Sequence, residues 1–225
     1  MTEEFSLKKI AEIKNGFNEK FGIPRQSGLC ESVKSKTIFE PDYRVNEAFK
    51  GLEEFSHIWI IWQFSKAVRE DWSPTVRPPR LGGNKRMGVF ATRSPFRPNS
   101  LGLSCVKLDK VEFTDDLGPV LHISGADLMD GTPIFDIKPY IPYADSKTDA
   151  TEGFTSTPKR RLEVEFAESL NVSYELKENI KEIIAEDPRP AYQNENGRVY
   201  KFCYADFEIE FTVSDSTATV TDIRK

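Results

Sequence analysis

Prolines and glycines interrupt the middle of the chain at short intervals, and this spacing constrains the fold more than any other feature. Proline lacks the backbone N–H that a helix needs and its ring clashes with the preceding turn, so no long helix can cross this segment. Turn-forming residues at such spacing indicate loops and short strands instead. Between residues 73 and 102 they include Pro78, Pro79, Gly82, Gly83, Pro95, Pro98 and Gly102.

Short apolar runs around this segment also favour strands. Residues 58–62 form a β-branched and aromatic run, and further apolar runs lie at 87–92, 101–106 and 120–124. Short strands separated by turns are typical of a barrel or a folded sheet. We therefore expect a mainly β fold in which residues 1–143 form a single-sheet, β-barrel-like domain.

The last third of the chain has a different pattern. Residues 144–158 are rich in Asp, Ser, Thr and Gly, which predicts a linker. Residues 162–166 and 207–213 alternate like strands. Between these two strands, apolar side chains recur at helical spacing from Leu170 to Ile184, and Pro188 ends the helix. We expect residues 159–225 to form a small α+β domain.

Composition limits the class of protein. The 225 residues are 38% hydrophobic and 30% charged, as in soluble folded proteins. The acidic N-terminus lacks the features of a secretory signal, and the longest apolar run is too short to span a bilayer. The three cysteines are scattered, without metal-ligand or disulfide spacing. These features predict a cytoplasmic protein that does not associate with membranes.

Several kinds of active site are missing from the sequence. His57 and His122 are far apart and lack zinc-ligand spacing, so we expect no metal. His57, before an apolar strand, is more typical of a structural histidine than of a catalytic one. No phosphate-binding loop, nucleophile elbow or glycine-rich dinucleotide fingerprint occurs. An adenosyl cofactor would therefore need a non-Rossmann site.

Positive charge is concentrated in one stretch although the net charge is −5. A local cationic face on an acidic protein can still bind RNA phosphates. A solvated basic loop is the alternative, but proline or glycine beside several arginines stiffens or tightly turns the backbone that aims them. No acidic residue lies between Asp71 and Asp109, whereas the basic residues there are Arg77, Arg80, Lys85, Arg86, Arg93, Arg97 and Lys107.

A second candidate cluster lies in residues 127–143. Asp136 and Lys138 are two apart and would face the same side of an extended chain, with Tyr140 following. A carboxylate, an ammonium and a phenol together could serve acid–base chemistry. The turn signature at residues 130–133 also fits a simple hairpin connection.

A third cluster follows the predicted tail helix. Arg189 lies between Pro188 and Pro190, with Tyr192 close behind. The prolines alone could simply end the helix. A rigidly presented arginine next to an aromatic ring also suits RNA, so we predict that Arg189 and Tyr192 contact it.

Several long segments of the chain form specific motifs. They are FGIPRQSG (21–28), GLEEFSHIW (51–59), RPPRLGG (77–83), GVFATRSPFRPNSLG (88–102), DGTPIFDIKPY (130–140) and DPRPAY (187–192). Together these motifs resemble the TrmO (TsaA-like) family of tRNA methyltransferases. The resemblance is dense over the first 143 residues and rests in the tail mainly on DPRPAY and the strand that follows it.

This resemblance implies a β-barrel-like, non-Rossmann methyltransferase that works as a homodimer with S-adenosylmethionine near the subunit contact. The implied substrate is threonylcarbamoyl-adenosine beside the anticodon of tRNA, methylated on its exocyclic nitrogen. Ser65 and Lys66 fall where the family motif is loose. By position, the cofactor-binding residues would be Gln26, Ser27, Gly28, Ser65, Lys66, Arg93, Leu103, Asp130, Gly131, Thr132 and Pro133.

The implied substrate suggests a mechanism. The adjacent carbonyl of a carbamoylated adenine makes its exocyclic N–H more acidic, so one positioned base could help it attack the methyl group. Asp136 is the predicted base, with Lys138 and Tyr140 orienting the substrate. RNA contacts are expected from Arg77, Arg80, Lys85, Arg86 and Arg97. Two alternatives are a non-catalytic RNA-binding module and a methyltransferase acting on a small molecule or protein.

Overall fold

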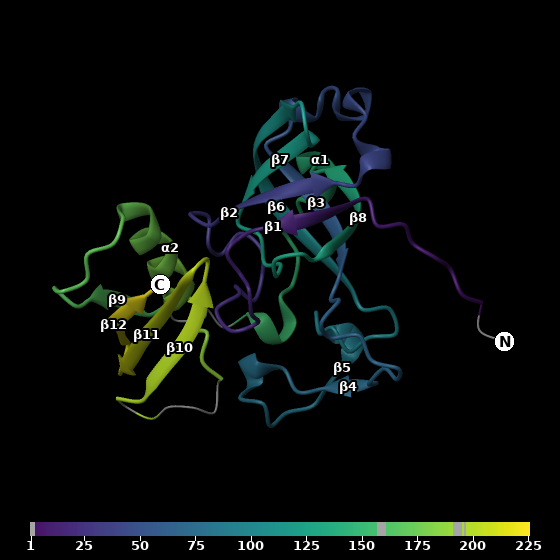
Figure 1. Ribbon diagram of the computed structural model, residues 1–225. Coiled ribbons are helices and arrows are strands. Elements are labelled where there is room, and N and C mark those ends of the chain that lie inside the picture. The colour runs from purple at the N-terminus through teal and green to yellow at the C-terminus, as the bar shows by residue number, and fades with distance from the viewer. Residues whose placement is uncertain (1–2, 157–160, 191–194, 196) are drawn as a thin grey trace.

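The computed structural model describes residues 3–156, 161–190, 195 and 197–225. Figure 1 shows a barrel, a lobe outside the barrel that carries two short strands, and a C-terminal sheet with a helix. Most of the chain outside the helix α2 is strand or loop, which confirms the prediction of a mainly β fold.

Six strands close into a barrel in which every pair of neighbours is antiparallel. Alternate residues face the interior, so Ile58, Ile60 and Trp62 are buried while Trp59 and Ile61 face outward. The predicted barrel is therefore confirmed. In spatial order its strands are β1 (Ala11–Lys14), β2 (Lys34–Phe39), β7 (Gly118–Ser124), β6 (Leu101–Thr114), β3 (His57–Gln63) and β8 (Pro133–Pro139).

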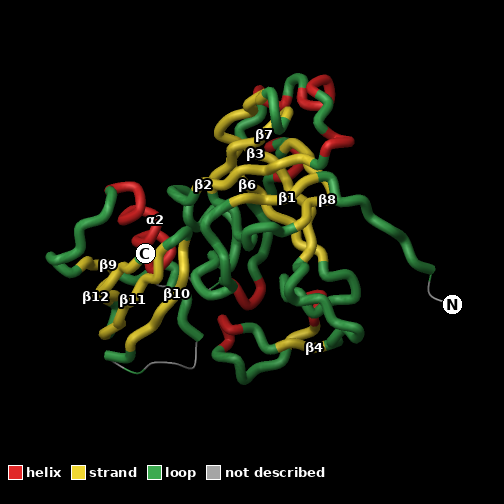
Figure 2. The backbone as a smooth tube through the Cα atoms, viewed as in Figure 1, coloured by secondary structure: helices red, strands yellow, loops and turns green. Residues whose placement is uncertain are grey.

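Residues 64–100, which we call the lobe, leave the barrel between β3 and β6. Figure 2 shows that this region is mostly loop, as its prolines and glycines predicted. The expected strand at 87–92 is shorter than predicted, because a 3₁₀ turn replaces its second half. The elements of the lobe are β4 (Thr75–Val76), η4 (Pro79–Leu81), β5 (Met87–Gly88) and η5 (Val89–Ala91).

Short helices occupy the other connections. Three 3₁₀ turns lie between β2 and β3, and a one-turn helix and a 3₁₀ turn follow β8 in the predicted linker. Their bounds are η1 (Pro41–Tyr43), η2 (Asn46–Phe49), η3 (Leu52–Glu54), α1 (Pro142–Asp145) and η6 (Gly153–Thr155).

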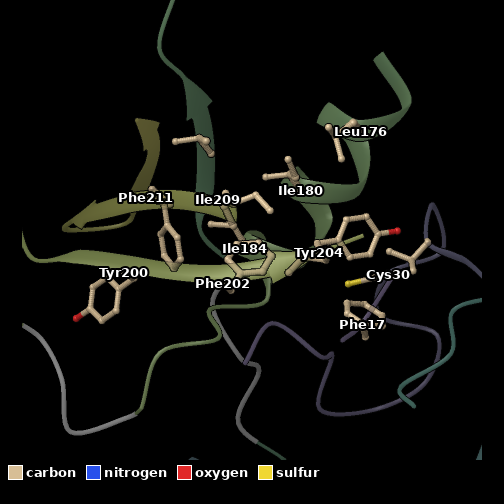
Figure 3. Packing of buried hydrophobic residues seen from close by; sticks show 14 of the residues in the cluster. Phe17, Cys30, Leu176, Ile180, Ile184, Tyr200, Phe202, Tyr204, Ile209 and Phe211 are labelled. Atoms are coloured by element: carbon tan, nitrogen blue, oxygen red, sulfur yellow. The ribbon is translucent and has the colours of Figure 1, made fainter. Parts of the chain in front are cut away.

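The C-terminal region is α+β, as predicted. The Ser173 hydroxyl caps α2 by accepting a hydrogen bond from the Leu176 backbone. The apolar face of α2, including Ile180 and Ile184, packs on the sheet (Figure 3). No described helix is long and apolar enough to cross a membrane. The elements are β9 (Glu163–Phe166), α2 (Tyr174–Ala185), β10 (Val199–Tyr204), β11 (Phe207–Ser214) and β12 (Thr217–Arg224), with sheet order β10-β11-β12-β9.

The connection between β1 and β2 belongs partly to the C-terminal core. Phe17 and Cys30 are fully buried there, and the Phe17 ring packs edge-on against Tyr204 with centroids 5.3 Å apart (Figure 3). The Ala205 backbone N–H also donates to the Gly16 carbonyl at 2.7 Å. Residues 15–33 therefore pack between the barrel and the C-terminal sheet. This segment carries three of the predicted cofactor residues.

Candidate active site

One end of the barrel collects the loops that carry most of the predicted cofactor residues. At this end β1, β3 and β7 finish, and β2, β6 and β8 begin. Successive antiparallel strands return the chain to the same end, so the connections at residues 15–33, 64–100 and 125–132 meet there. Segments far apart in the sequence can thus build one site.

A hydrogen-bonded cluster joins these three loops. The Arg93 guanidinium donates to the Gln26 side-chain oxygen across 67 residues of sequence. The Gly28 N–H donates to the Gly125 carbonyl at 2.8 Å. A Cβ on Gly125 would lie 3.1 Å from Gly28 Cα, so a larger residue there would push the loop away. The structure therefore brings Gln26, Ser27, Gly28 and Arg93 together at this end of the barrel.

Asp127 lies at the centre of this cluster. Its Oδ1 accepts a hydrogen bond of 2.5 Å from Ser104 Oγ, and that hydroxyl accepts one of 2.9 Å from Trp62 Nε1. The Ser27 backbone also donates to the Asp127 carboxylate. A polar chain thus runs from the barrel core to the loop at residues 26–28, and it fixes that loop against the barrel.

Burial raises the pKa of Asp127 above its ordinary value, although the Ser104 hydrogen bond and the Arg93 charge oppose the shift. Burial disfavours the charged form of a carboxyl group, so a buried carboxyl beside an exposed guanidinium is typical of a functional site. The sequence analysis missed this residue as a site residue. Its position just after the apolar strand and Gly125 was the available signal, because strand ends carry many site residues.

The turn at residues 130–133 lies at the same end of the barrel. Asp130 Oδ1 accepts a hydrogen bond of 2.9 Å from the Asn15 N–H. Thr132 is buried, and its hydroxyl donates to the Met129 carbonyl at 2.7 Å. Gly131 has a φ of 71° and open space where a Cβ would stand. The side chains of Asp130 and Thr132 therefore stabilise the turn, whereas Gly131 leaves its backbone accessible. Pro133 follows as the first residue of β8.

The remaining predicted cofactor residues lie around this end. The Lys66 carbonyl accepts a hydrogen bond of 2.8 Å from Lys20 Nζ, which ties the start of the lobe to residues 15–33. Ser65 precedes it, and its N–H donates to the Gln63 carbonyl at 2.7 Å. The Leu103 side chain is 54% exposed on the outer face of β6.

The predicted catalytic residues lie on the outer wall of the barrel. Asp136 and Lys138 face the same side, as expected, and form an ion pair of 2.9 Å. Asp136 and Leu103 both pair with Ile61, so the three residues form one row across β8, β3 and β6. Tyr140 is not part of this pair. Its ring packs against Trp59 instead, with centroids 5.8 Å apart.

The predicted RNA-binding residues of the lobe differ in how they are held. The Arg80 guanidinium donates to the Thr155 carbonyl at 2.7 Å, and that of Arg86 donates to Thr75 Oγ1 at 2.7 Å. Arg97 donates to the Thr92 carbonyl at 2.9 Å. These contacts hold the three side chains in place. All but the half-buried Arg97 are exposed, and the five residues are Arg77, Arg80, Lys85, Arg86 and Arg97.

Arg189 is placed differently from the sequence-based expectation. It is only 9% exposed, and its guanidinium forms a bidentate pair with Asp187 at 2.7 and 3.0 Å. The Arg189 carbonyl accepts a hydrogen bond of 3.0 Å from Arg25, the neighbour of Gln26. The structure therefore does not present Arg189 to RNA; this residue supports the loop at 26–28. Tyr192 lies outside the described residues.

The cofactor cluster is open in a single chain. A cavity of about 810 Å³ is lined by residues of β1, β2, β6 and β7 and by Ala205 and Asp206, and none of the predicted cofactor residues lines it. Gly28 and Arg93 are exposed instead. Among the described residues, no group of His, Cys, Asp or Glu could hold a metal ion.

Comparison with known proteins identifies the family. The family model described as tRNA-methyltransferase O N-terminal domain matches residues 12–146, and the TrmO C-terminal domain model matches residues 159–225. The chain belongs to the TrmO family. Its fold agrees with a crystal structure of TrmO from Pseudomonas aeruginosa at a TM-score of 0.83, with 32% identity over 99% of both chains.

Two relatives align over nearly the whole chain. The tRNA (adenine(37)-N6)-methyltransferase of Escherichia coli (strain K12) is 41% identical over 223 residues, which cover 94% of each protein. A putative S-adenosylmethionine-dependent methyltransferase, RcsF, of Pseudomonas aeruginosa is 40% identical over 216 residues, which cover 92% of this chain and 91% of that protein.

Proposed function

We propose that the protein transfers the methyl group of S-adenosylmethionine to the exocyclic nitrogen of threonylcarbamoyl-adenosine beside the anticodon of tRNA. Relatives named tRNA (adenine(37)-N6)-methyltransferase support this activity, among them that of Eikenella corrodens, 48% identical over 169 residues. The observation that carries the proposal is the placement of two groups of opposite charge, the Arg93 guanidinium and the Asp127 carboxyl, beside the loop at residues 26–28.

This cluster fits the methyl donor chemically. The methionine end of S-adenosylmethionine carries a carboxylate and an ammonium group, which match the Arg93 guanidinium and the Asp127 carboxylate. Gly28 has a φ of 77°, and no atom lies within 4 Å of the position of a Cβ, so a ligand can approach its backbone. When bound, the donor supplies an activated methyl group on a positively charged sulfur.

The outer wall of the barrel suits the acceptor. Asp136 and Lys138 are largely exposed and paired with each other. The carboxylate on the threonyl part of the substrate can pair with Lys138 instead, which frees Asp136 to accept the proton from the exocyclic nitrogen. The row of paired residues that links Asp136 to Leu103 places this base near the barrel end that carries most of the predicted cofactor residues. Tyr140 orients the modified base.

A homodimer would complete this open site. Gly28, Arg93 and Leu103 are exposed in one chain, whereas methyl transfer benefits from a water-excluded site. A second copy of the chain, packed against the outer wall of the barrel, would cover the exposed cofactor residues and Leu103. Light scattering together with activity measurements tests this arrangement, and a strictly monomeric, fully active enzyme would contradict it.

Transfer of a labelled methyl group to purified tRNA tests the activity. We expect S-adenosylmethionine to label tRNA that contains threonylcarbamoyl-adenosine, and mass spectrometry of the nucleosides to show one added methyl group on that residue. Unlabelled tRNA with no donor binding in calorimetry would favour a non-catalytic RNA-binding module. Unlabelled tRNA with normal donor binding would favour a small-molecule or protein substrate.

Substitution of Arg93 by Ala should weaken donor binding about tenfold, because one charge-assisted contact is lost. The melting temperature should stay within a degree or two, since the exposed side chain leaves no cavity. The matched control is Arg77→Ala, an exposed arginine of the same lobe, which should keep donor affinity and lower tRNA affinity. Equal donor affinity in wild type and Arg93→Ala would remove Arg93 from the site.

A further inference from the structure

Two large aromatic side chains are stacked on the surface of the lobe. The rings of Trp72 and Phe90 lie 5.9 Å apart between centroids, with planes inclined by 28°. Trp72 is 47% exposed and Phe90 is 72% exposed. Exposed apolar rings that stack on each other form a flat face that water solvates poorly, which is typical of a binding surface.

The backbone beneath these rings is held firmly. The Ser73 N–H donates to the Phe96 carbonyl at 3.0 Å, and the Val89 N–H donates to the Pro74 carbonyl at 3.0 Å. Val89 is 1% exposed and anchors the turn that presents Phe90. The rings are therefore presented in a defined position, so a ligand would not have to order them.

Positive charge lies beside the Phe90 ring of this face. The Arg97 guanidinium lies 6.0 Å from the centroid of the Phe90 ring, and that of Arg69 lies 3.7 Å from the Phe96 ring. Glu70 and Asp71 precede Trp72, but beyond Asp71 the lobe contains only basic charges. Arg93, three residues after Phe90, borders the proposed donor site. An aromatic face edged by arginines is complementary to a nucleobase with its phosphate.

We propose that Trp72 and Phe90 form a stacking platform for an unpaired nucleobase of the substrate RNA, with Arg97 beside its phosphate. This inference rests on the proposed function, because it names how that RNA is held. Single-stranded bases stack on aromatic side chains whatever their sequence, whereas paired bases are not accessible. The platform therefore selects the unpaired loop of the RNA over its stem.

Binding of a synthetic anticodon stem-loop to variants tests the platform. Trp72→Ala and Phe90→Ala should each weaken stem-loop binding roughly tenfold, the loss expected for one stacking contact. Trp72→Phe should restore most of the affinity. Stem-loop binding should quench tryptophan fluorescence in the wild type and much less in Trp72→Phe. A fully paired RNA of the same length should bind equally to all variants.

The control is Phe113→Ala, because Phe113 is 53% exposed at the opposite end of β6. This variant should bind RNA like wild type.

Unchanged stem-loop affinity in both alanine variants, Trp72→Ala and Phe90→Ala, would overturn the inference. A fall in S-adenosylmethionine affinity would assign the rings to the donor adenine, and dissociation of a dimer in light scattering would assign them to a second copy; both overturn it. If wild type neither binds nor methylates tRNA, the proposed function itself fails.

Discussion

Replacement of Asp127 by Asn is expected to weaken S-adenosylmethionine binding about 30-fold without lowering the free energy of unfolding. The loss corresponds to roughly 2 kcal/mol, the size of one hydrogen bond to a charged group. The amide oxygen can still accept the hydrogen bonds from Ser104 and the Ser27 backbone, so the loop at 26–28 stays in place. Calorimetry and chemical denaturation measure the two quantities.

The pH dependence follows from the raised pKa of Asp127. Between the ordinary carboxyl pKa and this raised value, the folded state binds more protons than the unfolded state. Stability from this group is therefore present at low pH and is lost as pH rises through that window. Asp127→Asn removes the titration, so its unfolding free energy should fall less with rising pH than that of wild type.

Asp109 is a matched control. It also accepts a serine hydroxyl, from Ser124, but Lys34 pairs with it at 3.1 Å. Burial alone would raise the pKa of Asp109, but the hydrogen bonds from Ser124 and Lys34 together with the charges of Lys34 and Lys107 outweigh it, and the pKa is lowered. Asp109→Asn should therefore lower stability and leave donor affinity unchanged. If Asp127→Asn behaves in the same way, Asp127 has only a structural role.

Replacement of Arg189 by Ala is expected to destabilise the fold by about 3 kcal/mol. It breaks a bidentate ion pair and leaves the carboxylate of Asp187 partly buried without its partner. The value lies at the low end for buried pairs because the Asp187 side chain is 26% exposed. Donor affinity should also fall, because the ion pair with Asp187 fixes the backbone whose Arg189 carbonyl accepts the hydrogen bond from Arg25, the neighbour of Gln26. Denaturant unfolding and calorimetry check both effects.

Arg198 provides the comparison for this substitution. Its guanidinium lies 5.7 Å from the Tyr200 ring, the same ring that Arg189 approaches at 5.9 Å. Arg198 is exposed, and its guanidinium lies 3.5 Å from a carboxylate oxygen of exposed Glu195. Arg198→Ala should therefore change stability by less than about 0.5 kcal/mol. A similar small effect for Arg189→Ala would mean that its ion pair contributes little.

Strands with an apolar pattern could be predicted from the sequence, whereas polar strands could not. The run at residues 207–213 was assigned as a strand because apolar and polar residues alternate in it. The run at 58–62 was assigned as a strand because it is β-branched and aromatic. β1 has four residues, and two of them are charged. Its strand character depends on pairing with β2 and β8, which a local pattern does not reveal.

The sequence by itself determined the apolar strands β3, β6, β7 and β11, the helix α2 and the family motifs, because these depend on local pattern and residue identity. The tertiary structure alone decided which polar groups meet. Barrel closure brings Arg93 to Gln26 and places Asp127 against Ser104, and packing buries Arg189 against Asp187. Whether a charged side chain binds a ligand or supports the fold depends on its burial and partners, and long-range packing sets both.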